Sequence, residues 1–327
     1  MVAGTDEIAE ALWYVAPGRA EIRTERLPRL QPGHVRVHTF YSALSRGTES
    51  LVAAGRVPES EHQRMRAPFM GGAFPFPVKY GYANVGRVEA GPAGLVGKDV
   101  FSLSPHQTLI DLPEGMAVPL PAGVPASRAV LSANMETALN ALWDAEPKDG
   151  AKIAVVGAGV LGALVGFLAA KVKGAEVTLI DINPARAQIA KALGIGFSKP
   201  EDAPTERDLV FHTSANAAGL TTALNLCADE ASVLELSWYG AGTVPVPLGG
   251  AFHSRRLKLI SSQVGKVAPS RRATHTYRQR LEEAMALLAD KRLDVLLAPP
   301  VKFRDLPARL PDIFAPQSGI LCQLITY

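Results

Sequence analysis

Cysteine is nearly absent from this chain of 327 residues, which contains only Cys227 and Cys322. Two cysteines that lie far apart in sequence exclude a disulfide framework, and they also exclude a zinc site built from four cysteines. We expect both thiols to be buried as small apolar side chains. Hydrophobic packing, rather than disulfide bonds, must then stabilise the fold. A chain of this length with 47% hydrophobic residues can bury sizeable cores.

Excess charge and long apolar runs are lacking as well. The net charge of +3 is too small and too dispersed to indicate a nucleic-acid partner. The 17 uninterrupted apolar residues from Ala154 to Ala170 fall short of the ~20 that a membrane-spanning helix needs. The N-terminus, MVAGTDEIAE, carries acids and no apolar segment, so no signal peptide is visible and we expect a cytoplasmic protein.

The stretch from Lys152 to Asp181 predicts a strand, a turn, a helix and a second strand. Ile153 to Val156 is apolar and rich in β-branched residues, which is typical of a strand buried on both faces of a parallel sheet. Three glycines with the spacing G-x-G-x-x-G follow at the change from strand to helix, where backbone amides can face a pyrophosphate at the helix N-terminus. The residues expected to bind a dinucleotide here are Gly157, Gly159, Val160, Leu161 and Gly162.

The second strand, Glu176 to Ile180, ends at Asp181, which lies 19 residues beyond Gly162. A carboxylate at this position accepts hydrogen bonds from a ribose 2′-hydroxyl and repels a 2′-phosphate. The sequence therefore predicts NAD rather than NADP as the cofactor.

Two domains are expected from the length of the chain and from a change of pattern along it. Residues 1–126 are strand-like, and their short segments are separated by Pro-Gly turns, so we interpret them as a mostly β domain. The proline-punctuated stretch from Leu112 to Pro121 predicts the passage to a second domain, residues 127–265, in which strands and helices alternate. Residues 266–327, with a helix from about Thr274 to Leu288, are expected to return to the first domain.

Three short motifs follow one another along the chain: Arg46-Gly47-Thr48-Glu49, Gly81-Tyr82-Ala83, and the segment from Ala133 to Thr137. They resemble the C-G-T-D, G-H-E and C-x-x-x-T motifs of the medium-chain dehydrogenase/reductase superfamily, the fold of the zinc alcohol dehydrogenases. The resemblance covers nearly the whole chain. It implies an α/β protein with a GroES-like β-rich catalytic domain and a Rossmann nucleotide-binding domain, and a homodimer joined through strands of the nucleotide domain.

Every zinc ligand of the superfamily is replaced in these motifs. Arg46, Tyr82 and Ala133 occupy the three positions, and a guanidinium group would repel a metal cation. The loop SLSPHQTLIDLP after Phe101 contains no cysteine and is too short for the structural zinc lobe of the superfamily. The resemblance implies a zinc-free protein, similar to the zinc-less branch that includes a dehydrogenase acting on the hydroxyethyl side chain of a bacteriochlorophyllide.

Without zinc, side chains must handle the proton that a secondary alcohol loses as hydride leaves its carbon. Thr48 stands where the superfamily has its proton-relay hydroxyl, and the alternative is a threonine that caps the turn after Gly47. Tyr82 carries a phenol that can donate to a carbonyl oxygen, or it is a packing tyrosine. His106, in the short loop, is either a general base or a solvent-exposed loop histidine.

The remaining candidates concern the substrate and the nicotinamide. Arg46 either pairs with Glu49 or orients a substrate carboxylate or carbonyl group. Trp238 and Tyr239 either wall the substrate pocket or are core aromatics. Ser237 and Gln263 stand at the ends of the expected fifth and sixth strands and should lie near the nicotinamide.

A basic segment, Arg255 to Arg280, holds eight lysines and arginines and no acid. One interpretation is a solvated face, which is common for such runs. The other is that Lys266, Arg271 and Arg272 border the substrate cleft and favour an anionic substrate.

Together with the resemblance, these residues predict a zinc-independent, NAD-dependent oxidoreductase that interconverts a secondary alcohol and a ketone. The substrate is expected to be a fairly large, ring-bearing small molecule, and an anion if the basic segment borders the cleft. Two alternatives remain open. One is a reductase of activated double bonds, as in the quinone-reductase branch, which usually uses NADP, and the other is a catalytically idle NAD(H)-binding protein.

Overall fold

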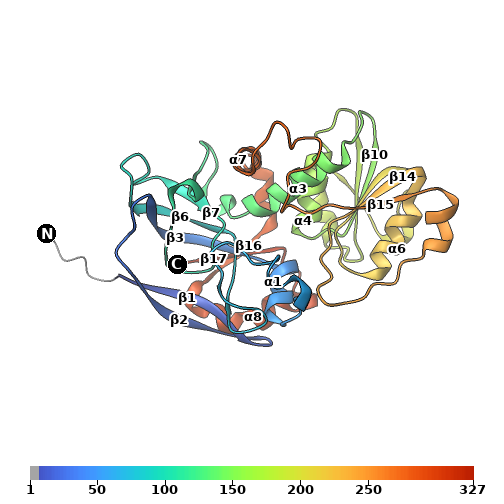
Figure 1. Cartoon of the computed structure of the whole chain (residues 1–327). Coiled ribbons are helices and arrows are strands. Elements are labelled where there is room, and N and C mark those ends of the chain that lie inside the picture. Colours follow the sequence, from blue (N-terminus) through green and yellow to red (C-terminus); the bar gives the residue numbers. More distant parts are fainter. Residues whose placement is uncertain (1–6) are drawn as a thin grey trace. The chain divides into compact units, whose positions relative to one another are not determined.

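The computed structural model describes residues 7–327, which form two compact units (Figure 1). One unit holds the described residues up to Ala133 together with Leu297–Tyr327, and the other holds Asn134–Leu296. The chain therefore leaves the first unit once and returns to it once.

The first unit is built on a sheet of mostly antiparallel strands in the order β16-β17-β3-β6-β7-β9, with β8 paired to β3. A smaller sheet has the order β2-β1-β5-β4. Val35 and Val37 alternate along β3 and pack with Val88 of β6, so one face of the larger sheet forms a core. The elements of this unit are β1 (Glu7–Ala16), β2 (Arg19–Leu27), β3 (His34–Ser45), α1 (Arg46–Ala53), β4 (Gly71–Gly72), β5 (Val78–Lys79), β6 (Asn84–Ala90), β7 (Asp99–Ser102), β8 (Leu109–Pro113), β9 (Val118–Pro119), α2 (Ala126–Ala129), β16 (Leu297–Lys302), α8 (Leu306–Phe314) and β17 (Cys322–Thr326).

The second unit is built on a parallel sheet in the order β12-β11-β10-β13-β14-β15. Numbered along this unit, the order is 3-2-1-4-5-6, that of a Rossmann sheet, and it reverses between β10 and β13. Ile153, Ala154 and Val155 of β10 are fully buried, as predicted for a strand covered on both faces. The elements are α3 (Ser132–Ala145), which crosses the boundary between the units, β10 (Lys152–Val156), α4 (Val160–Ala169), β11 (Glu176–Ile180), α5 (Arg186–Leu193), β12 (Gly196–Ser198), β13 (Arg207–His212), α6 (Ala217–Leu226), β14 (Cys227–Glu235), β15 (Lys258–Ser261) and α7 (Tyr277–Leu287).

The predicted fold class, a GroES-like β-rich domain with a Rossmann domain, is confirmed, but the chain changes units at other places than predicted. Residues 266–296 remain with the second unit. The cause is α7, whose buried Arg280 pairs with Glu136 of α3 at 3.0 Å. The stretch from Leu112 to Pro121 is not the passage, because it contains the end of β8 and all of β9, and β9 pairs with β7.

The segment 127–143, which has a helical pattern, is divided between α2 and α3. The apolar run from Ala154 to Ala170 is divided as well, because it contains most of β10, the glycine turn and α4. Within residues 7–327 no helix is long and apolar enough to cross a membrane. Cys227 and Cys322 are both buried, as predicted.

Candidate functional site

The glycine turn between β10 and α4 has the geometry that its spacing predicts. Gly157 has φ +102°, where other residues are strained, and a Cβ there would lie 2.8 Å from the amide nitrogen of Ser214. A Cβ at Gly162 would collide with the carbonyl oxygen of Gly157, so only glycine lets α4 lie this close to β10. Gly159 is the N-cap of α4 and faces open space, and Val160 and Leu161 form the first turn of the helix. The unpaired amides of this helix end can therefore meet an anion.

Asp181 lies at the carboxyl end of β11, beside the glycine turn. Its Oδ2 accepts a hydrogen bond of 2.7 Å from the amide of Ala158, and its Oδ1 accepts one of 2.8 Å from the amide of Asn183. Each oxygen keeps a lone pair for a further donor such as a ribose hydroxyl. Burial lowers the pKa of Arg186 nearby, and the charge of Asp181 opposes this effect.

A histidine and a glutamate that the sequence did not single out meet at the same edge of the sheet. Nδ1 of His212, the last residue of β13, lies 2.7 Å from Oε2 of Glu235, the last residue of β14. Burial opposes the ionised form of Glu235, but the interactions with His212 and the hydrogen bonds from Ser237 together outweigh it and lower the pKa of Glu235. No sequence motif marks the two residues, because their meeting depends on the register of β13 and β14.

Four candidates for the nicotinamide and the substrate also lie in the second unit. Ser237, Trp238 and Tyr239 follow β14 and are half-buried. The phenol of Tyr239 donates to Glu235 at 2.9 Å, and burial together with that carboxylate raises the pKa of Tyr239. Gln263 is exposed, and its Oε1 accepts from the amide of Gly265 at 2.6 Å, so its side chain folds back on its own loop.

In the first unit, Thr48 and Tyr82 come together. Thr48 lies in the first turn of α1, and the side chains of Ser45 and Thr48 partly offset the rise in the pKa of Tyr82 that burial causes. Burial raises the pKa of Tyr82 well above its ordinary value, and the charge of Glu49 raises it further. The phenol therefore stays protonated at neutral pH and can act as a donor.

His106 is fully buried, so the interpretation of an exposed loop histidine is wrong. Its Nδ1 lies 2.8 Å from the hydroxyl of Ser42, and its Nε2 lies 2.9 Å from Oε2 of Glu49. The hydroxyl of Ser42 is in turn 2.8 Å from that of Tyr327. His106 is thus one member of a buried chain of polar groups in which both ring nitrogens have partners.

Arg46 and Glu49 do not have the arrangement considered from sequence. The guanidinium group of Arg46 donates to the carbonyl oxygens of Ile320 at 2.6 Å and Ala315 at 2.9 Å. Glu49 is fully buried, and its carboxylate accepts from the amide of Ser45 at 2.8 Å and pairs with His106. Arg46 therefore anchors the chain before β17, and Glu49 fixes the start of α1.

Much of the basic segment from Arg255 to Arg280 is neutralised by local ion pairs. Arg271 is exposed, and its guanidinium group lies 5.7 Å from the ring centroid of Trp143, near the end of α3. Next to Trp143, Asp144 of α3 accepts a hydrogen bond of 2.6 Å from the hydroxyl of Ser262, which follows β15. Arg272 donates to the carbonyl oxygen of Val267, and Lys266 is exposed. The ion pairs are Arg255–Glu206, Arg256–Glu230, Arg278–Glu282 and Arg280–Glu136.

The side chains at the zinc-ligand positions of the superfamily do not fit that metal. A guanidinium group, a phenol of raised pKa and a methyl group stand at residues 46, 82 and 133. Cys322 pairs with Ser45 across the β17–β3 ladder, but burial raises the pKa of its thiol to about 12. Within residues 7–327 no three His, Cys, Asp or Glu side chains are grouped so that they could hold a metal ion.

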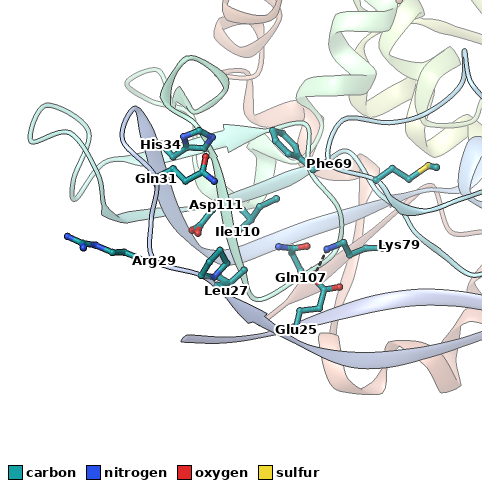
Figure 2. A pocket seen from close by; sticks show the side chains of 12 residues that line it. Glu25, Leu27, Arg29, Gln31, His34, Phe69, Lys79, Gln107, Ile110 and Asp111 are labelled. Carbon is teal, nitrogen blue, oxygen red and sulfur yellow. Dashed lines mark hydrogen bonds and ion pairs between the residues drawn. The ribbon is translucent and has the colours of Figure 1, made fainter. Parts of the chain in front are cut away.

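A hollow of about 350 Å³ opens on the first unit, beside β2 and β8 (Figure 2). Figure 2 shows Gln107 next to the ion pair of Lys79 and Glu25, whose Nζ and Oε2 lie 2.6 Å apart. Gln107 follows His106 in sequence, but neither His106 nor the hydroxyl pair of Thr48 and Tyr82 lines this hollow. The hollow is therefore separate from the candidate catalytic residues.

No protein-family model matches the sequence. The chain is 25% identical over 220 residues to an uncharacterized zinc-type alcohol dehydrogenase-like protein of Haemophilus influenzae. The match covers 63% of this chain and 60% of that relative, so it spans less than two thirds of the relative's length.

Solved structures share the fold over almost the whole chain at low identity. L-idonate 5-dehydrogenase of Escherichia coli K-12 has a TM-score of 0.79 and 14% identity, with 99% of both chains covered. A dehydrogenase of Sinorhizobium meliloti 1021, described as zinc-binding and bound to NADP, has a TM-score of 0.77 and 15% identity, with 98% of this chain and all of that one covered. An alcohol dehydrogenase of Escherichia coli CFT073 complexed with NADH has a TM-score of 0.77 and 15% identity, with 98% and 99% covered. The chain therefore shares the fold of these dehydrogenases, and its partial sequence match is to a zinc-type alcohol dehydrogenase-like protein.

Proposed function

We propose that the protein is a zinc-independent, NAD-dependent oxidoreductase that interconverts a secondary alcohol and a ketone. The observation that carries the proposal is the glycine turn at the reversal point of a 3-2-1-4-5-6 sheet, with Asp181 at the end of the neighbouring strand. That combination fits a dinucleotide, and the relatives of the same fold include proteins with NADH or NADP bound.

The second unit supplies the groups that would hold NAD. The amides around Gly159, Val160 and Leu161 would meet the pyrophosphate, while Asp181 would accept from the ribose hydroxyls. Asp181 favours NAD over NADP because its charge repels a 2′-phosphate. Bound NAD would supply the acceptor for the hydride.

The first unit supplies the groups that would handle the proton. The half-buried hydroxyl of Thr48 can accept the proton of an alcohol while it passes its own proton to solvent, and in the reverse direction it can relay a proton from solvent to a ketone, with the phenol of Tyr82 as a hydrogen-bond donor to the reacting oxygen. The raised pKa of Tyr82 supports a role as donor, because a neutral phenol can stabilise a developing alkoxide oxygen. His106 would not contact the substrate, because its two ring nitrogens are bonded to Ser42 and Glu49. It would instead hold Glu49, and with it the start of α1, in place.

The chemistry of the side chains at the ligand positions supports the proposed zinc independence. Zinc binds thiolate, imidazole or carboxylate groups, and residues 46, 82 and 133 offer none of these. No step of the proposed reaction is therefore assigned to a metal.

The substrate is proposed only as a class, a ring-bearing secondary alcohol, by resemblance to the zinc-less branch. These contacts do not favour an anionic substrate, because half of the basic segment is neutralised by acids and the guanidinium group of Arg271 lies over the ring of Trp143. Trp238 and Tyr239 remain the proposed aromatic wall of the pocket.

A homodimer is proposed through β15, the edge strand of the Rossmann sheet. All four residues of β15 are exposed, and the side chains of Leu259 and Ile260 are 38% and 39% accessible. An apolar edge strand is a template for pairing with a second copy. Sedimentation velocity should show a dimer for the parent and a monomer for Ile260→Lys, whereas a monomeric parent would contradict the proposal.

Cofactor turnover separates the proposed function from its alternatives. Purified protein should form NADH from NAD when ring-bearing secondary alcohols are added. Consumption of NADPH with an enone or quinone, and no reaction with alcohols, would instead identify a double-bond reductase. Tight NAD binding with no turnover across both panels would identify a catalytically idle nucleotide-binding protein.

A further inference from the structure

We propose that His212 and Glu235 are positioning residues that shape the half of the dinucleotide site which takes the nicotinamide nucleotide. The inference rests on the proposed function, since it assigns a role within the same nucleotide site. It concerns two side chains that neither the sequence motifs nor the family resemblance assigned.

The two residues form a cross-strand pair at the carboxyl edge of the sheet. His212 and Glu235 are register partners of the adjacent strands β13 and β14. Their side chains, 0% and 14% exposed, approach to 2.7 Å. A buried ion pair contributes little net stability compared with apolar residues of the same size, but its directional bonds fix the geometry around it. The role of the pair should therefore lie in the two segments that it holds in place, those that follow β13 and β14.

Glu235 holds the segment that follows β14. Its Oε1 accepts from the amide of Ser237 at 2.7 Å, and its Oε2 accepts from the phenol of Tyr239 at 2.9 Å. The carboxylate thereby folds residues 236–239 back over the end of its own strand. The proposed pocket wall is thus oriented by Glu235.

His212 holds the segment that follows β13. Its Nε2 lies 2.7 Å from the hydroxyl of Ser214, which also accepts from Nδ2 of Asn216 at 3.0 Å. Asn216 is the N-cap of α6 and accepts from the amide of Gly219 at 2.8 Å. The chain of bonds therefore runs from His212 to the start of α6.

The two segments are bonded to each other and to the glycine turn. The amide of Ala215 donates to the hydroxyl of Ser237 at 3.1 Å. Thr213 donates to the carbonyl oxygen of Gly157 at 2.7 Å. In a Rossmann sheet each half takes one nucleotide, and Asp181 marks the adenosine half on β11. The network built on His212 and Glu235 consequently lies on the nicotinamide half.

Binding of NADH and of AMP tests this role, because AMP occupies only the adenosine half. In His212→Asn and in Glu235→Gln, the dissociation constant of NADH should rise about tenfold, as expected when a buried partner is left unsatisfied. The dissociation constant of AMP should stay at the parent value. Each constant is measured by titration of the folded protein, with folding checked by circular dichroism.

A second histidine–glutamate pair in the same unit provides the control. Nε2 of His275, which precedes α7, lies 3.6 Å from Oε2 of Glu283, which lies on α7. His275→Asn should leave both dissociation constants unchanged. Unchanged NADH binding in the folded Glu235→Gln protein, or equal weakening of NADH and AMP, would overturn the inference. A parent protein that binds neither ligand would overturn the proposed function itself.

Discussion

Nε2 of His106 lies 2.9 Å from Oε2 of Glu49 in the interior of the first unit, where the two side chains are 0% and 1% exposed. Glu49 also accepts from the amide of Ser45, the N-cap of α1. The buried pair therefore supports the helix turn that carries Thr48. The pair thus links the first motif, Arg46 to Glu49, to the loop that carries His106.

Breaking this pair should destabilise the protein. Glu49→Gln leaves His106 without its charged partner, and removing one member of a buried pair costs about 3 kcal/mol. Urea unfolding followed by circular dichroism should show a lower midpoint for Glu49→Gln. The control is Glu230→Gln, because Glu230 and Arg256 form an exposed pair at 3.4 Å that should contribute nothing measurable. Equal midpoints for parent and Glu49→Gln would refute the role of the pair.

Removing a hydroxyl of the proposed proton pair should lower turnover more than substrate affinity. A proton relay matters chiefly in the transition state, and such groups contribute about 10²-fold or more. Thr48→Ala and Tyr82→Phe should therefore lower kcat by about 10²-fold, with KM and NAD binding near the parent values. Steady-state kinetics on the parent's alcohol substrate measure both. Near-parent kcat in Tyr82→Phe would show that the phenol only packs.

Asp181 should set the choice between the two dinucleotides. Asp181→Ser removes the charge that repels a 2′-phosphate, so NADP should bind more tightly to the variant than to the parent. Fluorescence titration with NADH and NADPH measures the ratio of dissociation constants. Equal affinities of the parent for the two nucleotides would count decisively against this assignment.

Local features were predictable from sequence because neighbouring residues determine them. The stretch from Lys152 to Asp181 predicts β10, the glycine turn and β11 from apolar runs and glycine spacing. The segment from Ile320 to Tyr327 predicts a final strand, and it contains β17, which pairs with β3.

Partnerships between distant residues were not predictable in this way. From sequence, Arg280 is part of a charged run that could form a solvated surface. In the structure it pairs with Glu136, which lies 144 residues earlier, and this pair keeps α7 with the second unit. From sequence, His106 is predicted to be a loop residue without a known partner. Its partner Glu49 lies 57 residues away, and their contact depends on how β3 and α1 pack. His212 and Glu235 meet only once the register of β13 and β14 is known.

The central claim is alcohol oxidation with NAD and without a metal, and one measurement tests it most directly. NADH formation from a ring-bearing secondary alcohol is followed by absorbance, with protein dialysed against a strong chelator and with untreated protein. We predict equal rates in the two samples, with no increase when zinc is added back, because Arg46, Tyr82 and Ala133 offer no zinc ligand. A rate that falls on chelation and returns with zinc would contradict the account.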